Sequence, residues 1–360
     1  MKITFVLPGI GLSGGVKAVF EFANHLYARG HDVSIIYPLI PMREGARWYN
    51  LRKLAIQAKY SFINFKKRDY VDWFDLKVSL IRVPILTERY IPDADIVVAT
   101  WWETAYYVSK YSRDKGEKFY LVQHYETWGG PKKKVDNSYK LGLRIIVNST
   151  WLKNILEDEV GVKVESLIFH SPDREQFYPE NNKRTNDRIK ILIPYRREKW
   201  KGTEDGIKAF KIVKGKISNI QLILFGPQQG ENIPVYAKYY LKPSNTELRK
   251  IYNSCDIFLF PSRFEGFGMP PMEAMACRLA VATTNVGAVP DYTIPGKTAL
   301  VSPPQDIKKM AQNVIKLIEN KDLREEIAQN GCDYIKQFTW EKATEQLEEV
   351  FKKYIKYESS

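Results

Sequence analysis

Short apolar runs alternate with amphipathic helical stretches along almost the whole chain, and this alternation limits the folds that the sequence can adopt. A first series of apolar runs predicts strands at residues 3–7, 33–37, 78–83, 96–100, 119–123, 144–147 and 165–168. A second series predicts strands at residues 189–194, 221–225, 257–260 and 279–283. Strands that alternate with helices pair in parallel and are covered by helices on both faces. The pattern therefore predicts an α/β protein.

A polar, turn-rich segment at residues 170–188 separates the two series. The 360 residues suffice for two domains of about 150–200 residues each. We predict two tandem Rossmann-like, doubly wound domains, residues 1–170 and 171–338, that face each other across a cleft and bind ligand where strand carboxyl ends meet it. Residues 339–360 hold a last amphipathic helix, which either covers the second domain or crosses back to the first.

The formal net charge of +13 indicates an anionic partner: nucleic acid, a phospholipid surface or a phosphorylated substrate. No apolar stretch approaches the ~20 residues that a membrane span needs, and the N-terminus does not resemble a signal peptide. Cys255, Cys277 and Cys332 lack the spacing of a zinc site or a disulfide framework. We expect a cytoplasmic protein.

The stretch PSRFEGFGMPPME, residues 261–273, carries the strongest chemical signal. A strand ends at Pro261, a glycine-rich loop follows, and Pro270 suits the first position of a helix. Backbone N–H groups and the positive end of the helix dipole suit a diphosphate. Glu265 and Glu273 are acceptors that suit sugar hydroxyls. In the first turn, however, Glu273 could simply complement the helix dipole.

The longer string PSRFEGFGMPPMEAMACRLAVATTNVGAVPD resembles the signature of the retaining glycosyltransferases of family 4, the group 1 glycosyl transferases, which share the two-domain GT-B fold. Glu265 and Glu273 match the Glu-x7-Glu pair of that family. The resemblance implies that Glu265 and the backbone amides of Gly266, Phe267 and Gly268 hold the donor sugar. It also implies that Glu273 binds the ribose hydroxyls.

Three more motifs extend the resemblance over nearly the whole chain. SGGV resembles the glycine loop of the family, which implies that Gly14 and Gly15 approach the donor phosphates. YRREKWKG resembles its basic turn, which implies that Arg196 and Lys201 neutralise the leaving diphosphate. In VQHYETW, His124 matches a histidine beside the donor sugar and the acceptor. The resemblance thus makes His124, Glu265, Arg196 and Lys201 the candidate catalytic residues.

Each of these motifs also has a simpler interpretation. An isolated basic turn is usually solvated, and an isolated histidine is usually structural. Glu126 either contacts the sugar acceptor or only orients its own loop. We expect Tyr240 and Leu241 to lie near a backbone-lined pocket for the base of the nucleotide. The DxD string at Asp93 and Asp95 precedes a strand, so we interpret it as turn chemistry and predict no metal.

The resemblance implies a hexosyl or other glycosyl transfer from a nucleotide sugar to a hydroxyl of a glycan or lipid-linked acceptor, as in polysaccharide biosynthesis. It implies retention by front-face displacement, with no cofactor. Residues 43–69 carry eight Lys/Arg and two Asp/Glu between aromatic residues. They could bind an anionic membrane peripherally, or form a helix pair that packs on the sheet with a solvated basic face.

Three other classes remain open at this point. An epimerase, hydrolase or phosphorylase on the same fold would also use the sugar site, but a phosphorylase needs a far larger chain. The basic charge suits a nucleic-acid-binding protein, although no nucleic-acid module appears, so we expect no such partner. A nicotinamide dehydrogenase is disfavoured because the first glycine loop departs from GxGxxG and Tyr37 and Pro38 stand where an acidic residue would end the second strand.

Overall fold

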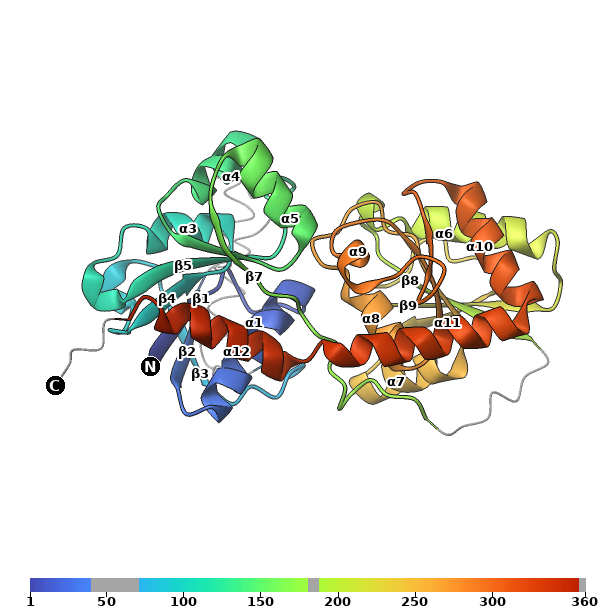
Figure 1. Cartoon of the computed structure of the whole chain (residues 1–360), viewed down its shortest axis with the longest axis horizontal. Coiled ribbons are helices and arrows are strands. Elements are labelled where there is room, and N and C mark those ends of the chain that lie inside the picture. The colour runs from blue at the N-terminus through green and yellow to red at the C-terminus, as the bar shows by residue number, and fades with distance from the viewer. Residues whose placement is uncertain (40–70, 181–187, 356–360) are drawn as a thin grey trace. The chain divides into compact units, whose positions relative to one another are not determined.

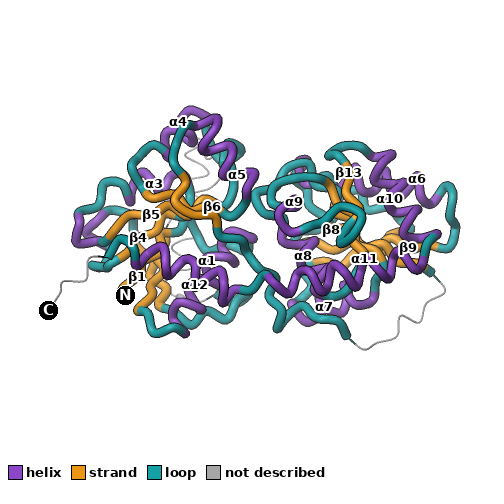
Figure 2. Tube along the Cα trace, viewed as in Figure 1, coloured by secondary structure: helices purple, strands orange, loops and turns teal. Residues whose placement is uncertain are grey.

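The computed structural model describes residues 1–39, 71–180 and 188–355, which divide into two units (Figure 1). Unit 1 comprises Met1–His170 and the C-terminal segment that starts at Trp340, and unit 2 comprises Ser171–Thr339. In each unit, helices surround a central group of strands (Figure 2). The predicted α/β class and Rossmann-like architecture are confirmed.

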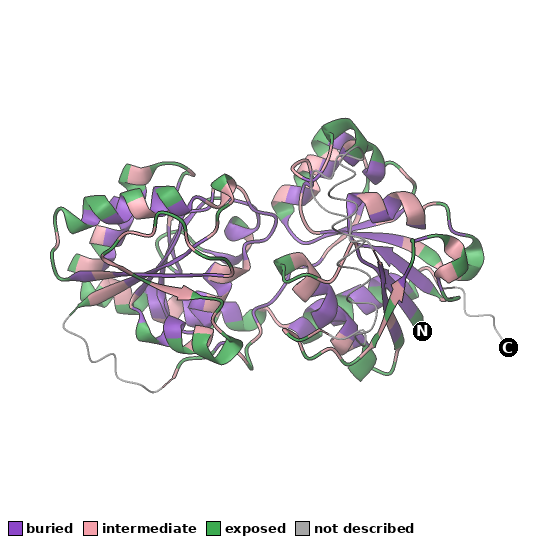
Figure 3. Cartoon of the chain, turned by 180° about the vertical axis from the view of Figure 1, so that it is seen from behind, coloured by how far each residue is buried: buried purple, intermediate pink, exposed green. Residues whose placement is uncertain are grey.

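The sheet of unit 1 contains, within the described residues, seven parallel strands in the order β3-β2-β1-β4-β5-β6-β7. The strands are Lys2–Val6 (β1), Asp32–Pro38 (β2), Ser79–Val83 (β3), Ile96–Ala99 (β4), Glu117–Val122 (β5), Arg144–Val147 (β6) and Val164–Leu167 (β7). The central strands are buried along almost their whole length (Figure 3), as a sheet covered on both faces requires. The strand order reverses between β1 and β4, which makes this pair the topological switch point.

The described helices of unit 1 cover this sheet. They are Gly14–Ala28 (α1), Trp102–Val108 (α3), Lys132–Tyr139 (α4), Thr150–Asn154 (α5) and Trp340–Lys352 (α12). A π-helical turn, Ile155–Val160, continues α5, and single 3₁₀ turns lie at Glu88–Tyr90 and Arg113–Lys115.

The sheet of unit 2 contains, within its described part, six parallel strands in the order β10-β9-β8-β11-β12-β13. The strands are Ile189–Pro194 (β8), Ile220–Gly226 (β9), Ala237–Leu241 (β10), Ile257–Phe260 (β11), Ala280–Thr284 (β12) and Leu300–Ser302 (β13). Here the order reverses between β8 and β11, so the loops after these two strands flank the switch point.

Helices cover both faces of this second sheet as well. They are Thr203–Lys214 (α6), Asn245–Ser254 (α7), Met269–Ala276 (α8), Val289–Tyr292 (α9), Ile307–Glu319 (α10) and Lys321–Tyr334 (α11). Single 3₁₀ turns lie at Lys199–Lys201 and Ile335–Gln337. The apolar core between β8, β9, β11, α6 and α10 includes Ile193, Phe210 and Leu224, all fully buried.

Two strands of unit 2 carry no clear sequence signal. β10 is an edge strand whose residues are only half-buried or exposed, and β13 is three residues long. Neither needs a continuous apolar run, so neither shows one. The basic aromatic segment at residues 43–69 lies outside the described residues. Among those that are described, no helix is both long and apolar enough to cross a membrane.

Helix α12, the last helix in the chain, packs on α1 in unit 1. The Trp340 ring lies edge-on to Phe22 at 5.1 Å, and Phe351 contacts Phe119 of β5 with ring centroids 4.8 Å apart. These aromatic contacts bury the apolar stripe of α12 against unit 1, although unit 2 precedes it directly in the sequence.

A buried carboxylate adds an electrostatic contact between α12 and the α1–β2 junction. The Glu348 side chain is 7% exposed; its Oε2 accepts from Arg29 Nε at 2.6 Å and its Oε1 from Lys352 Nζ at 2.5 Å. His31 Nε2 lies 3.2 Å from the same Oε1. Burial by itself raises the pKa of Glu348, but the hydrogen bonds from Lys352 and Arg29 outweigh it and lower this pKa to about 2.

Glu348→Gln should therefore destabilise the protein, by about 1–2 kcal/mol at pH 7, because the cations lose their carboxylate partner. A carboxyl with a depressed folded-state pKa contributes stability above its unfolded pKa of ~4.5 and loses it as the pH falls toward 2. Urea unfolding between pH 7 and pH 3 should show the difference between variant and wild type shrinking below pH 4.5. Glu349→Gln, on the exposed face of the same helix, is the control; equal losses in both variants would contradict the assignment.

Candidate functional site

The two loops at the switch point of unit 2 contact each other directly. The carbonyl of Trp200, in the loop after β8, accepts hydrogen bonds from the backbone N–H groups of Arg263 at 2.8 Å and Phe264 at 3.3 Å, in the loop after β11. Arg263 also reaches across to Asp205 of α6 with its Nε at 2.6 Å and its Nη2 at 2.8 Å. This two-pronged contact fixes the loops as one structure.

Gly202 allows this close approach. Its φ is +65°, and a Cβ added there would lie 1.9 Å from the carbonyl oxygen of Pro261. Gly287 makes a similar approach from the loop after β12: its φ is +53°, and a Cβ would lie 2.7 Å from the carbonyl oxygens of Glu265 and Gly266. Only glycine fits such positions without moving the neighbouring backbone.

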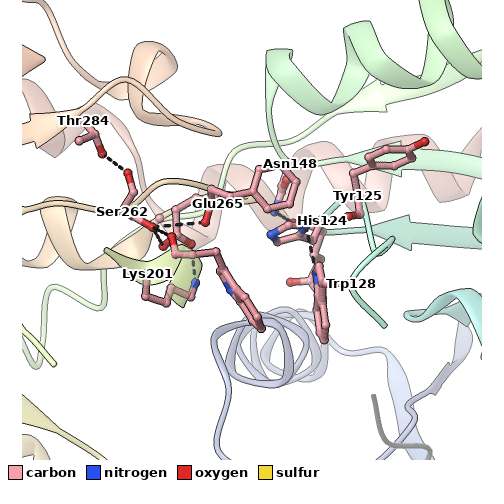
Figure 4. Close-up of polar contacts among 12 residues, drawn as sticks. His124, Tyr125, Trp128, Asn148, Lys201, Ser262, Glu265 and Thr284 are labelled. Atoms are coloured by element: carbon pink, nitrogen blue, oxygen red, sulfur yellow. Dashed lines mark hydrogen bonds and ion pairs between the residues drawn. The ribbon is translucent and has the colours of Figure 1, made fainter. Parts of the chain in front are cut away.

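Glu265 lies where the two loops meet, and its side chain is 9% exposed. One carboxylate oxygen accepts from Lys201 Nζ at 2.8 Å, and the other accepts from Ser262 Oγ at 2.8 Å (Figure 4). Ser262 is held in turn by its carbonyl, which accepts from Thr284 Oγ1 at 2.5 Å. The structure thus brings together two residues that the sequence placed 64 positions apart, Lys201 and Glu265.

The segment after Glu265 is largely buried and leads into α8. Gly266, Phe267 and Gly268 precede the helix, and the carbonyl of Gly268 accepts from the buried Tyr292 hydroxyl at 2.6 Å. Gly268 is the N-cap with φ +84°, so the first helical residue is Met269 rather than Pro270. The loop therefore leads into the helix N-terminus, as the sequence predicted, but the helix begins one residue earlier than predicted.

The predicted first-turn position of Glu273 was wrong, because α8 starts one residue earlier than predicted. Because α8 begins at Met269, Glu273 lies in the second turn, beyond the part where a carboxylate pairs with the helix dipole. Its Oε2 instead accepts a hydrogen bond at 2.9 Å from the hydroxyl of Tyr252, a fully buried residue of α7. Dipole pairing therefore does not account for Glu273.

Arg196 begins the loop after β8. Its backbone N–H donates to Thr203 Oγ1 at 2.9 Å, and Thr203 Oγ1 donates to the Arg196 carbonyl at 2.9 Å. This reciprocal contact closes the loop from Arg196 to the start of α6. The guanidinium of Arg196 also donates, through Nη1, to the Tyr195 carbonyl at 2.9 Å. Arg196 and Lys201 thus stand at opposite ends of one short loop at the switch point.

Tyr240 and Leu241 lie at the carboxyl end of β10, the edge strand. They pair with Phe225 and Gly226 of β9, and the Leu241 side chain is 45% exposed. Lys238 Nζ lies 4.7 Å from the centre of the Tyr240 ring. Tyr240 and Leu241 therefore share the carboxyl edge of the sheet with the loops at the switch point, two strands away from β8.

In unit 1, the glycine loop and the segment after β5 contact each other at the carboxyl edge of the sheet. Gly14 and Gly15 form the first turn of α1, and the N-cap Ser13 accepts from the Val16 N–H at 3.3 Å. Gln123 Nε2 donates to the Gly15 carbonyl at 3.1 Å, and the Gln123 carbonyl accepts from Asn148 Nδ2 at 3.1 Å. Gln123 and Asn148 had no signal in the sequence beyond their places at strand ends.

His124 follows Gln123 and is half-buried beside aromatic rings. Trp128 Nε1 lies 3.4 Å from His124 Nδ1, and the Tyr125 carbonyl lies 3.1 Å from the same nitrogen (Figure 4). The first contact needs Nδ1 as acceptor and the second needs it as donor, so a neutral imidazole makes one of them at a time. Since Nδ1 is engaged in either case, the position of its proton sets whether Nε2 donates or accepts.

Glu126 is fully enclosed at the carboxyl end of β5. Its Oε2 accepts from the Trp102 N–H at 2.7 Å and from the Tyr120 hydroxyl at 3.0 Å, and the residue is 2% exposed. Burial raises its pKa to about 8 against the opposing effect of these two hydrogen bonds. Of the two roles left open by the sequence, these contacts favour orienting the loop that carries His124.

The DxD string lies at the opposite, amino edge of the unit 1 sheet. Asp93 pairs with Lys115 at 2.6 Å, and Asp95 accepts from the Lys2 N–H at 2.6 Å just before β4. Both carboxylates thus take part in local turn and strand contacts, as predicted. Among the residues that the structure describes, no group of three His, Cys, Asp or Glu side chains is arranged to hold a metal.

Comparison with solved structures defines the class of the fold. HepE from Anabaena, solved with UDP and glucose, superposes with a TM-score of 0.75 at 15% identity, over 98% of this chain and 99% of that one. Sucrose-phosphate synthase from Thermosynechococcus elongatus gives a TM-score of 0.73 at 16% identity, over 98% of both chains. The fold is that of the GT-B glycosyltransferases.

The sequence comparisons give matches to glycosyltransferases over part of the chain. Residues 174–333, which include both loops of the unit 2 switch point, match the family model of the glycosyl transferases group 1. The capsular polysaccharide biosynthesis glycosyltransferase CapM of Staphylococcus aureus is 31% identical over 206 residues, 54% of this chain and 53% of that protein. Unit 2 is therefore similar to the group 1 glycosyltransferases over residues 174–333, as the motifs indicated, and the CapM match spans about half the length of that curated relative.

Gly202→Ala should disrupt the switch point of unit 2. A methyl group 1.9 Å from the Pro261 carbonyl oxygen must push the two loops apart, which we expect to cost about 2–4 kcal/mol of unfolding free energy. Gly215→Ala is the matched control, because its φ is −67° and its added Cβ meets no atom closer than 3.5 Å. Urea denaturation of both variants tests the assignment, and an unchanged midpoint for Gly202→Ala would refute it.

Glu126→Gln should change how stability depends on pH. A carboxyl with a raised folded-state pKa stabilises the fold fully below its unfolded pKa of ~4.5, and this contribution is lost as the pH rises through about 8. Glutamine keeps an acceptor for Trp102 and Tyr120 but does not titrate. Between pH 5 and pH 8 the variant should therefore gain on the order of 2 kcal/mol relative to the wild type. If plots of unfolding free energy against pH run parallel for the variant and the wild type across this range, Glu126 does not titrate in the folded protein.

Proposed function

We propose that the protein transfers a sugar from a nucleotide-sugar donor to a hydroxyl of a glycan or lipid-linked acceptor, with retention at the anomeric carbon. The observation that carries the proposal is the Lys201–Glu265 pair at the unit 2 switch point, beside the glycine-rich N-terminus of α8. A cation, a carboxylate that can accept hydrogen bonds from sugar hydroxyls, and the backbone N–H groups before α8 are the groups that a sugar diphosphate requires. The match of residues 174–333 to the group 1 family model and the UDP and glucose named with HepE support it.

Donor binding would separate the Lys201–Glu265 pair and use both partners. Lys201 Nζ would move from the carboxylate to the diphosphate, and Arg196, at the other end of the same loop, would approach it with its guanidinium. Glu265 would then accept hydrogen bonds from sugar hydroxyls, while Ser262 continues to hold its other oxygen. Glu273, aligned by Tyr252, would bind the ribose hydroxyls.

The chemical step would be a front-face displacement in which the departing phosphate takes the proton of the acceptor hydroxyl. No carboxylate is assigned as a covalent nucleophile. The work of the protein is to position the reactants and to stabilise charge on the leaving diphosphate, through Lys201, Arg196 and the N–H groups before α8. These cations suffice for the charge, so we propose that no metal is needed.

In unit 1, Gly14 and Gly15 would approach the donor phosphates at the start of α1, and His124 would lie beside the transferred sugar. Two named relatives have different named roles. CapM is a glycosyltransferase of capsular polysaccharide biosynthesis. A protein of Bacillus anthracis, 24% identical over 96% of this chain and 94% of its own length, is an N-acetyl-alpha-D-glucosaminyl L-malate synthase. We favour a glycan or lipid-linked acceptor in the cytoplasm. Peripheral membrane binding through residues 43–69 stays a prediction.

A panel of UDP-, GDP- and ADP-sugars, with and without glycan acceptors, tests the proposal. One donor should be consumed rapidly only when an acceptor is present. NMR of the product should show that the anomeric configuration is retained, and EDTA should leave the rate unchanged. Lys201→Ala should lower kcat about 10²–10³-fold, because the leaving diphosphate loses a cation. Lys208→Ala, which removes an exposed cation of α6, should leave the rate unchanged.

Two outcomes would contradict the proposal. Consumption of the donor at the same rate without any acceptor would indicate an epimerase or hydrolase on the same fold. Wild-type turnover in Lys201→Ala and in Glu273→Gln would show that the donor does not bind at these loops.

A further inference from the structure

Unit 2 contains a cavity of about 270 Å³ at the end of α8 opposite to the donor loops. Its wall includes Ala276, the last residue of α8, and Arg278, whereas the loop of Glu265 leads into the first residue of the same helix. Because α8 runs back from the carboxyl edge of the sheet toward the amino edge, the cavity and the donor loops lie at opposite edges. The cavity is therefore not part of the site already described.

Gln329 and Cys332 of α11 and the segments beside both connections between the units form the rest of the wall. The chain passes from unit 1 to unit 2 at His170 and returns after Thr339. Arg174, Phe177 and Tyr178 follow the first connection, and Lys336 lies just before the second. A molecule bound in this cavity would contact both connecting segments and the end of α8 together.

The wall is strongly basic. It contains Arg174, Arg278 and Lys336, and no aspartate or glutamate occurs among the described residues that line it. The nearby Asp333 accepts from Lys336 Nζ at 2.6 Å and from Gln329 Nε2 at 2.7 Å, so it holds two lining side chains in place. Because Asp333 neutralises Lys336, the net positive charge of the wall comes from Arg174 and Arg278, and this charge favours an anion. Phosphate suits the planar donors of arginine.

The backbone at Arg278 is an independent indication. Arg278 follows the C-cap of α8 with φ +58°, the left-handed position that helices usually fill with glycine. A non-glycine residue there costs conformational free energy, and such strained residues concentrate at functional sites. The arginine at this position lines the cavity and adds a third cation to its wall, which is a functional reason for the strained backbone.

We propose that this cavity binds a small phosphate monoester whose body is a single ring. The phosphate would lie among Arg174, Arg278 and Lys336, and the ring would pack against Phe177 and Tyr178. The volume is slightly below the roughly 300–1,000 Å³ of pockets that enclose drug-sized ligands, so a whole nucleotide sugar does not fit. The proposal does not depend on the transfer reaction proposed above.

Isothermal titration calorimetry with phenyl phosphate on the full chain tests the proposal. Phenol and inorganic phosphate, which represent the ring and the phosphate of this probe, are titrated separately. Phenyl phosphate should bind more tightly than inorganic phosphate, and phenol should not bind measurably. Arg278→Gly should weaken binding at least about tenfold while the Tm stays equal or rises, because glycine adopts the left-handed backbone without strain. Loss of binding would then not be a consequence of unfolding.

Two matched variants separate this cavity from general charge and from the donor site. Lys242→Gly removes a cation from another left-handed position, φ 47°, outside the cavity, and Lys201→Ala disables the donor loops. Both should bind phenyl phosphate as the wild type does. Wild-type affinity in Arg278→Gly, or an equal loss in Lys242→Gly or Lys201→Ala, would overturn the proposal. So would binding to phosphatidic acid vesicles without binding of phenyl phosphate, since it would indicate a lipid headgroup instead.

Discussion

The close approach of two backbone loops at the switch point of the unit 2 sheet is the constraint on which the donor site depends. Gly202 lies against the carbonyl of Pro261 with no room for a side chain, and the Trp200 carbonyl receives the N–H groups of Arg263 and Phe264. This contact brings Lys201 to within 2.8 Å of Glu265. Parallel strands make such a meeting possible, because the carboxyl ends of β8 and β11 reach the same edge.

The same principle orders unit 1, where the ends of β1, β5 and β6 meet. Gln123 bridges the glycine loop before α1 and Asn148 after β6, and His124 is the next residue. The buried Glu126 holds the turn beyond His124 through its contacts with Trp102 and Tyr120. Polar side chains that bond from one loop to the next thus define the geometry of this edge, since an alternative arrangement would break these hydrogen bonds.

Much of this could be predicted from local patterns. The observed β8 and β11 match the predicted ranges, residues 189–194 and 257–260, because central strands are buried on both faces and need continuous apolar runs. The candidate residues Glu265, Arg196, Lys201 and His124 lie in the loops that follow strands, as their motifs indicated. The edge strand β10 was not predicted, since its half-exposed residues need no apolar run, and the start of α8 was misplaced because Pro270 suits the second helical position as well as the first.

The sequence by itself determined the two parallel sheets and the motifs that resemble the group 1 glycosyltransferases, because each is written in a short stretch of neighbouring residues. Only the tertiary structure decided that Lys201 pairs with Glu265, that Tyr252 aligns Glu273, and that α12 packs on α1 through Glu348 and Arg29. It alone also gathered Arg174, Arg278 and Lys336 around one cavity. These contacts join residues that lie far apart along the chain, and the packing of strands and helices sets their distances, which no local pattern encodes.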